Sequence, residues 1–167
     1  MRFVLVRLSY FGAVKSPGSW PFKKHHTMRK LKSCGVLVVR GDPVAQFLLM
    51  VHPNRLDLPK GHVDAGESEI QCALRELVEE TSITQEDIQL DPDFCFTTHY
   101  TVRPLRFGGQ ECVKTVVIFL GYLIRDLEIR PTEHEGYRWT DWRPPHQIQA
   151  ETIDPLLSEL ERFLARR

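Results

Sequence analysis

The segment Leu58–Ile83, LPKGHVDAGESEIQCALRELVEETSI, gathers five glutamates and one aspartate beside a Pro-Lys-Gly turn. Like charges at helical spacing repel one another. Either water solvates these carboxylates separately, or a cation holds them together. The choice between the two interpretations determines what the surrounding domain can do.

The second half of this segment has the period of an amphipathic helix. With Glu76 at zero on a wheel of 100° per residue, Glu79 and Glu80 fall with it inside an arc of about 100°. Ser68 and Gln71 have the spacing of a capping box. We therefore predict a helix that runs to Thr81, with the carboxylates on one side. The side expected to face the core carries Ile70, Leu74, Leu77, Val78 and Thr81.

Most glutamate-rich helices are simply solvated, but two neighbours of this one favour a metal site. Arg75 lies one turn before Glu79, where it can orient that carboxylate. Lys60 lies in the turn before the helix. Hard cations such as Mg²⁺ prefer oxygen ligands, and carboxylates beside a phosphate-seeking lysine suit metal-assisted phosphoryl chemistry.

The spacing of the segment closely resembles the Nudix box, G-x5-E-x7-R-E-U-x-E-E-x-G-U, where U is a bulky aliphatic residue. Gly61 is followed after five residues by Glu67, and after seven more by the run REL-V-EE-T-S-I. Every fixed position matches except the final glycine, which is Ser82. If the turn after the helix is left-handed, it costs serine more than glycine.

The resemblance implies an α/β fold, an α/β/α sandwich with a mixed β-sheet, in which the box forms a loop-helix-loop. It implies Mg²⁺ or Mn²⁺ as cofactor, and a pairing of Glu67 with Arg75 that keeps the loop closed. The general base is left open between Glu79 and Glu76. The candidate metal ligands are the Gly61 carbonyl, Glu76, Glu79, Glu80 and Glu133, with Glu135 as the competitor of the last.

The flanks of the box are similar to those of the asymmetrical dinucleoside tetraphosphatases, over about residues 32–142. The similar stretches are LPKGHVDAGE, VKTVVIFL and TEHEGYRW. This similarity implies that Lys60 and Lys114 contact a polyphosphate and that Tyr137 stacks on a base, with Tyr100 as a second platform. His52 and Arg55, before the box, are further candidate phosphate contacts. The ordinary alternatives are a core aromatic for Tyr137 and a surface lysine for Lys114.

The function implied by the two resemblances is hydrolysis of a dinucleoside polyphosphate to a nucleoside triphosphate and a monophosphate by metal-activated water. Three other Nudix activities stay open: RNA 5′-pyrophosphohydrolase, nucleoside triphosphate pyrophosphatase and diphosphoinositol polyphosphate phosphohydrolase. A nucleotide-sensing module without catalysis is the alternative outside enzymes. Such modules generally lose box carboxylates, and none is lost here.

Composition sets the remaining limits. The 167 residues suit one domain, and a formal net charge of zero argues against a dedicated nucleic-acid partner. No apolar run reaches the roughly 18 residues of a membrane span. We expect a small-molecule partner, a nucleoside polyphosphate, and a cytoplasmic protein with reduced thiols, since no C-x-x-C spacing occurs. The cysteines are Cys34, Cys72, Cys95 and Cys112.

Two regions are expected along the chain: a basic N-terminal extension, 1–32, and a Nudix hydrolase domain, 33–167. Every charged residue before Asp42 is basic, and the extension has the composition of a poorly ordered loop. In the domain, strands and helices mix without strict βαβ alternation, which indicates a mixed sheet covered by helices. We predict strands at 34–40, 46–52, 93–103, 112–124 and 136–142, and a closing helix at 153–167.

Overall fold

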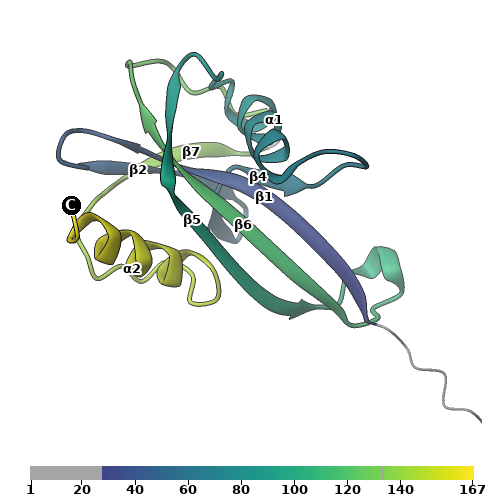
Figure 1. Cartoon of the computed structure of the whole chain (residues 1–167). Helices are drawn as coiled ribbons and strands as arrows, with labels where there is room; N and C mark the ends of the chain where they lie inside the picture. The colour runs from purple at the N-terminus through teal and green to yellow at the C-terminus, as the bar shows by residue number, and fades with distance from the viewer. Residues whose placement is uncertain (1–27, 133) are drawn as a thin grey trace, which may run out of the picture.

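The structure, a computed structural model, describes residues 28–132 and 134–167. In this part of the chain a seven-stranded sheet lies between two α-helices (Figure 1). The predicted extension up to residue 27 and the candidate ligand Glu133 lie outside the described residues. The elements are β1 Arg29–Arg40, β2 Gln46–His52, β3 Arg55–Asp57, β4 Lys60–His62, α1 Glu69–Thr81, β5 Ile88–Val102, the 3-10 helix η1 Leu105–Phe107, β6 Cys112–Leu123, β7 Gly136–Asp141 and α2 Ile153–Leu164.

The sheet is mixed, as predicted. Strand β1 pairs in parallel with β6 from Arg29 to Val39, whereas the other pairs are antiparallel. The main order is β3-β2-β1-β6-β5, with β7 beside β2. On its other edge β1 pairs with β2 only at its end and with β4 near its start, where Gly35 lies opposite Lys60. The Pro-Lys-Gly turn is thereby built into the sheet.

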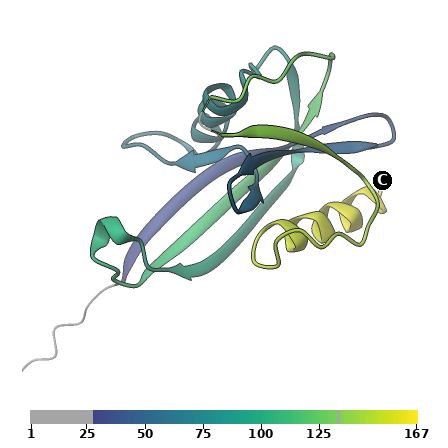
Figure 2. The same cartoon turned by 180° about the vertical axis from the view of Figure 1, so that it is seen from behind.

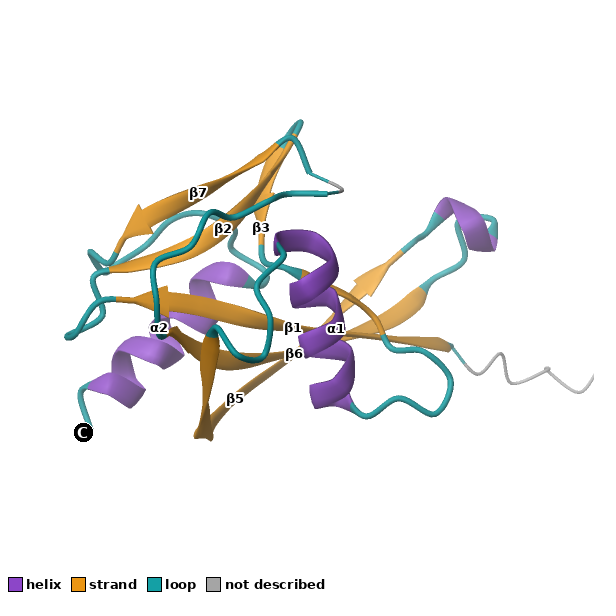
Figure 3. Cartoon of the chain, turned by 90° about the horizontal axis from the view of Figure 1, so that it is seen from above, coloured by secondary structure: helices purple, strands orange, loops and turns teal. Residues whose placement is uncertain are grey.

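The two α-helices cover opposite faces of this sheet, so the predicted α/β/α sandwich is confirmed (Figures 2 and 3). Alternate residues of β1 point to the two faces. Val36 and Val38 pack with the core under α1, and Leu37 and Val39 with the core under α2. The helices contribute Cys72, Ala73 and Leu77 from α1, and Ile153, Leu156, Leu157 and Leu160 from α2.

Helix α1 has the predicted capping box but a different buried face. Ser68 caps the helix and exchanges both capping hydrogen bonds with Gln71. Ile70 and Val78, predicted to face the core, are exposed, whereas Glu80 is buried. The helix packs on β1 and β4. Of the carboxylates on its charged side, Glu80 is turned to the interior, whereas Glu79 is exposed to solvent.

Several boundaries differ from the predicted ones. Strand β1 begins at Arg29, so the last residues assigned to the basic extension pair with β6. Strand β5 begins at Ile88, five residues before the predicted start. Strands β3 and β4 have three residues each, too few to show an alternating pattern. No described helix is long and apolar enough to cross a membrane.

Replacing Ser82 with glycine is expected to stabilise the protein. Ser82 adopts φ 63°, ψ 12°, and its N–H donates to the Val78 carbonyl at 2.9 Å. A left-handed conformation costs an L-residue roughly 1–2 kcal/mol, and part of this is offset because glycine loses more entropy on folding. Ser82→Gly should raise the free energy of unfolding by about 0.5–1 kcal/mol in urea denaturation. Ser82→Ala is the control and should not stabilise.

Candidate active site

The loop of the box lies against α1 because Gly61 has no side chain. A Cβ built on Gly61 would lie 2.0 Å from the Glu76 carboxylate. A second glycine, Gly35 of β1, lets Pro59 and Lys60 approach in the same way, since its Cβ would lie 2.3 Å from the Pro59 carbonyl oxygen. These two contacts place the Gly61 backbone directly beside the helix carboxylates.

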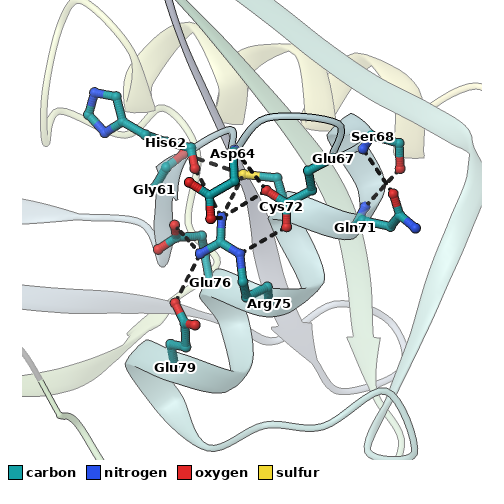
Figure 4. A network of polar contacts seen from close by, with 10 residues as sticks. All are labelled: Gly61, His62, Asp64, Glu67, Ser68, Gln71, Cys72, Arg75, Glu76 and Glu79. Carbon is teal, nitrogen blue, oxygen red and sulfur yellow. Dashed lines mark hydrogen bonds and ion pairs between the residues drawn. The ribbon is translucent and has the colours of Figure 1, made fainter.

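Arg75 is the centre of the polar network that joins the loop to α1 (Figure 4). It forms a two-pronged contact with Glu67, with both N–O distances 2.9 Å. The same guanidinium donates to Glu76 at 2.6 Å and to Glu79 at 3.0 Å. It also donates to the backbone carbonyl of His62 at 3.0 Å. The pairing of Glu67 with Arg75, which the resemblance implies, is present in the structure.

The network fixes the charge of its members. Hydrogen bonds from Arg75 lower the pKa of Glu67 to about 2. In turn, the bonds to Glu67 raise the pKa of Arg75, with smaller contributions from Glu76. Arg75 therefore stays cationic and Glu67 anionic at any working pH. Glu79, with its side chain 55% exposed, is the most accessible of the three glutamates that accept hydrogen bonds from Arg75.

Glu80 is the helix carboxylate that faces the interior of the protein. Its Oε2 accepts from the backbone N–H of Lys60 at 3.2 Å and lies 2.9 Å from Nε2 of His134. Both side chains are less than a tenth exposed. Burial raises the pKa of Glu80, and the neighbouring His134 and Lys60 oppose that effect. Glu80 thus ties α1 to β4 and to the segment before β7.

Asp57 connects this interior to the cationic side of the site. Its Oδ1 lies 2.9 Å from Nζ of Lys60, and its Oδ2 lies 3.3 Å from Nε of Arg55. Burial disfavours the charged form of Asp57, but Lys60, the Leu58 N–H and Arg55 together outweigh this effect and hold the pKa of Asp57 below its usual value. Nε2 of His52 lies 4.0 Å from Asp57, and its ring meets the His134 ring edge to face, with centroids 4.4 Å apart. His52 therefore lies between Asp57 and the His134–Glu80 pair.

One pocket brings together four of the predicted substrate contacts. Arg55, Lys60, Tyr100 and Lys114 line a cavity of about 190 Å³. Burial lowers the pKa of Lys114, and the positive charge of Lys60 lowers it further. An anion in the pocket would relieve this repulsion between the two lysines. The remaining lining residues are Asp57, Gln149, Glu151 and Thr152; the pocket is called the phosphate pocket below.

Tyr137 lies away from this pocket. It is opposite Met50 in the β2–β7 pair, and Met50 packs in the core under α1. Tyr100 packs instead against the core under α2. The two tyrosines predicted to stack on bases therefore lie on opposite faces of the sheet. The side chain of Tyr137 is available to a ligand, since the residue is 38% exposed.

The helix carboxylates have the chemistry of a site for a hard divalent cation. All the candidate donors among the described residues are oxygen atoms, from Gly61, Glu76, Glu79 and Glu80, and Gly61 leaves room for the Glu76 carboxylate. No three acidic, histidine or cysteine side chains among residues 28–132 and 134–167 form a ready-made metal cluster. Arg75 instead holds two of the carboxylates. The donor set fits such a cation in its ligand type.

Two residues of this site were not singled out from the sequence: Asp57 and His134. Both lie near the predicted residues along the chain, but each acts through a contact that a local pattern does not show. The signal for Asp57 is a lone acid between apolar residues, three positions before Lys60. Such an acid, once buried, needs a cationic partner. For His134 the sequence offers only its position between two glutamates.

Comparison with models of protein families identifies the family of the chain. The NUDIX domain model matches residues 30–165, and the chain belongs to the Nudix family. Members of this family generally need a divalent metal ion.

Among its relatives, the chain is similar to asymmetrical bis(5'-nucleosyl)-tetraphosphatases. It is 31% identical to that of Rattus norvegicus over 147 residues, 80% of this chain and 95% of the relative. It is 30% identical to that of Caenorhabditis elegans over 141 residues, 81% and 97% of the two chains. The crystal structure of a C. elegans Ap4A hydrolase binary complex matches with a TM-score of 0.70 and 29% identity, over 82% of this chain and 99% of that one.

A shorter similarity joins the chain to a different activity. It is 38% identical to the mRNA-decapping protein g5R of African swine fever virus over 72 residues, which is 43% of this chain and 26% of the relative. The Nudix domain of Shewanella oneidensis NrtR, solved with ADP ribose, has a TM-score of 0.61 at 17% identity. That likeness concerns the fold alone.

Proposed function

We propose that the protein hydrolyses dinucleoside polyphosphates, such as diadenosine tetraphosphate, to a nucleoside triphosphate and a monophosphate. The observation that carries this proposal is the phosphate pocket, where Arg55, Lys60 and Lys114 converge beside Tyr100. Three cations suit several adjacent phosphates, and an aromatic ring suits a base. The similarity to two tetraphosphatases over most of both chains supports the same substrate class.

Lys60 links the pocket to the carboxylates. Its ammonium group lines the phosphate pocket, and its backbone N–H donates to Glu80 of α1. A phosphate bound by this lysine would therefore lie close to the carboxylate side of the helix. Asp57 holds the ammonium group in place at 2.9 Å, which lowers the entropy lost when substrate binds.

Glu76, Glu79, Glu80 and the Gly61 carbonyl would hold Mg²⁺ or Mn²⁺, which when bound activates water and neutralises phosphate charge. The general base is Glu79 or Glu76. Arg75 orients both of these carboxylates by direct hydrogen bonds. The base accepts the proton of the attacking water, and the cations of the phosphate pocket stabilise the charge that develops on the phosphoryl oxygens.

Base stacking is the feature that separates dinucleotide substrates from other polyphosphates. Stacking on an aromatic ring contributes about 1–3 kcal/mol. If Tyr100 or Tyr137 stacks on a base, its replacement by alanine should raise KM for diadenosine tetraphosphate about 5- to 150-fold. The value of kcat should change much less, because stacking acts equally on ground and transition states. Hydrolysis of a diphosphoinositol polyphosphate, which has no base, should be unaffected.

The measurement is kcat/KM for wild type and the two variants on a substrate panel, with product identification, in Mg²⁺ and in Mn²⁺. The panel also includes a nucleoside triphosphate and a triphosphorylated RNA 5′ end. The RNA arm is included because of the short similarity to a decapping protein. Preference of the wild type for the RNA or the inositol compound would refute the proposed substrate and leave the carboxylate site intact. Full turnover by both variants would assign the tyrosines to packing.

The proposal also concerns the cellular compartment of the enzyme. All four cysteines lie in the described residues and are free thiols, which favours a reducing compartment such as the cytoplasm. A nucleotide-sensing module without catalysis is disfavoured because every carboxylate of the box is present.

A further inference from the structure

A second pocket adjoins the phosphate pocket at Lys114. It has a volume of about 370 Å³ and lies between the box loop and the β5–β6 connection. Its polar lining consists of His62, Arg103, Arg106 and Lys114, and Leu31 and Pro104 contribute apolar walls. Lys114 lines both pockets. Every ionisable side chain of the second pocket is basic.

A hydrogen bond joins two side chains of this pocket, Arg106 and His62. Nη2 of Arg106 lies 2.6 Å from Nε2 of His62. Arginine can only donate, so the imidazole has to accept and stay neutral. A bound anion would be attracted to the guanidinium group of Arg106 and the ammonium group of Lys114.

Few acidic groups compensate this charge. Arg103 pairs with Glu111. Neither Arg106 nor Lys114 has an ion pair with an acidic side chain of the described residues. Phosphate oxygens are the complementary ligand for such a set, since arginine binds them in two-pronged geometry and lysine as a point charge.

The β5–β6 connection that carries Arg106 is held by ring contacts and backbone hydrogen bonds. In η1 the guanidinium groups of Arg29 and Arg106 both lie over the Phe107 ring, at 4.2 and 4.9 Å from its centroid. The turn closes through hydrogen bonds from Phe107 to Pro104 at 3.0 Å and from Gly108 to Leu105 at 2.9 Å. Figure 3 shows η1 projecting from the sheet beside the start of β1, away from α2.

The box loop joins this pocket to the catalytic network. The backbone carbonyl of His62 accepts from Arg75, while its imidazole ring points away from that network (Figure 4). A polyphosphate lying across Lys114 would therefore meet Lys60 and Arg55 on one side, and Arg106 and His62 on the other.

We propose that this second pocket is an anion subsite that binds the phosphate groups of a substrate beyond Lys114, with Arg106 as its main ligand. The subsite rests on the proposed function for the site of cleavage, and it deepens that proposal by giving a basis for selecting long polyphosphates. Arg106 contributes to binding rather than to the chemical step.

The test is Arg106→Gln, with Arg162→Gln as the matched control. Arg162 is exposed on α2 and lines neither pocket, and its replacement removes the same charge. Arg106→Gln should weaken binding of inorganic tripolyphosphate, measured by calorimetry, about 10-fold. It should raise KM for diadenosine tetraphosphate by a similar factor with little change in kcat. Arg162→Gln should change neither.

Equal effects of the two variants would overturn the subsite, because the change would then reflect net charge alone. Unchanged tripolyphosphate binding by Arg106→Gln would overturn it as well. If Arg106→Gln weakens tripolyphosphate binding but wild type does not cleave diadenosine tetraphosphate, the subsite stands and the proposed function fails. Circular dichroism of both variants checks that a loss of tripolyphosphate binding does not result from a loss of folding.

Discussion

Replacement of Glu80 by glutamine is expected to lower kcat about 10³-fold, equivalent to about 4 kcal/mol of barrier. Glutamine keeps the shape and an acceptor oxygen for the Lys60 N–H, which now donates to Glu80 at 3.2 Å. It removes the negative charge with which Glu80 would bind the divalent cation of the proposed metal site. Because Glu80 is only 5% exposed, water has little access to this position and cannot replace the lost carboxylate.

The experiment compares kcat at saturating substrate and Mg²⁺ for wild type, Glu80→Gln and Glu86→Gln. Glu86 is exposed beyond the end of α1 and serves as the control for loss of one carboxylate. Thermal unfolding should show Glu80→Gln as stable as wild type, since a buried charge disappears. Wild-type turnover should stop in excess chelator. Undiminished kcat in Glu80→Gln would remove this residue from the metal site, and turnover in chelator would refute metal dependence altogether.

The box was predictable from sequence because its chemistry is local. The carboxylates, Arg75 and the cap at Ser68 all lie on one helix and the turn before it, so their spacing alone places them together. The long strands were predictable for the same reason, since alternation is visible within each segment. The mixture of elements indicated a mixed sheet covered by helices, and the resemblance to the Nudix box implied the α/β/α sandwich.

The orientation of α1 was not predictable in the same way. Ile70 and Val78 look like core residues on a helical wheel, yet they are exposed, while Glu80 is buried. A helical wheel identifies an apolar side, but it contains no information on tertiary contacts. It therefore cannot show that β4 and the segment before β7 supply partners for a carboxylate. Lys60 N–H and His134 provide them, and tertiary contacts outweigh the local pattern.

Long-range contacts also decide which candidate residues meet. Each of the four predicted contacts that line the phosphate pocket comes from a different strand: Arg55 from β3, Lys60 from β4, Tyr100 from β5 and Lys114 from β6. Only the order of the strands in the sheet brings them together. The sequence stretch around Tyr137 supported base stacking at least as well as that around Tyr100. The β2–β7 register, however, places Tyr137 on the α1 face of the sheet, opposite to Tyr100.

Gly61→Ala is expected to lower kcat/KM about 10²-fold while leaving the protein folded. The new methyl group would lie 2.0 Å from the Glu76 carboxylate, so either that side chain or the loop has to move. The carboxylate is the far end of a flexible side chain, and its displacement costs little stability. The gain in stability from replacing glycine, about 0.4–1 kcal/mol, partly offsets the strain. A displacement of about 1 Å in a positioned group, however, can cost 10²-fold in rate.

The matched control is Gly136→Ala, because a Cβ at Gly136 meets nothing within 4 Å. Both variants are compared with wild type by urea denaturation and by kcat/KM across a range of Mg²⁺ concentrations. Gly61→Ala should need more Mg²⁺ for half-maximal rate, since the moved carboxylate is a candidate ligand, whereas Gly136→Ala should behave as wild type. A Gly61→Ala protein with normal activity would show that the close approach of the loop to Glu76 is a packing contact without catalytic consequence. If it instead unfolds at far lower urea, the glycine supports the fold, and the activity loss then says nothing about the placement of Glu76.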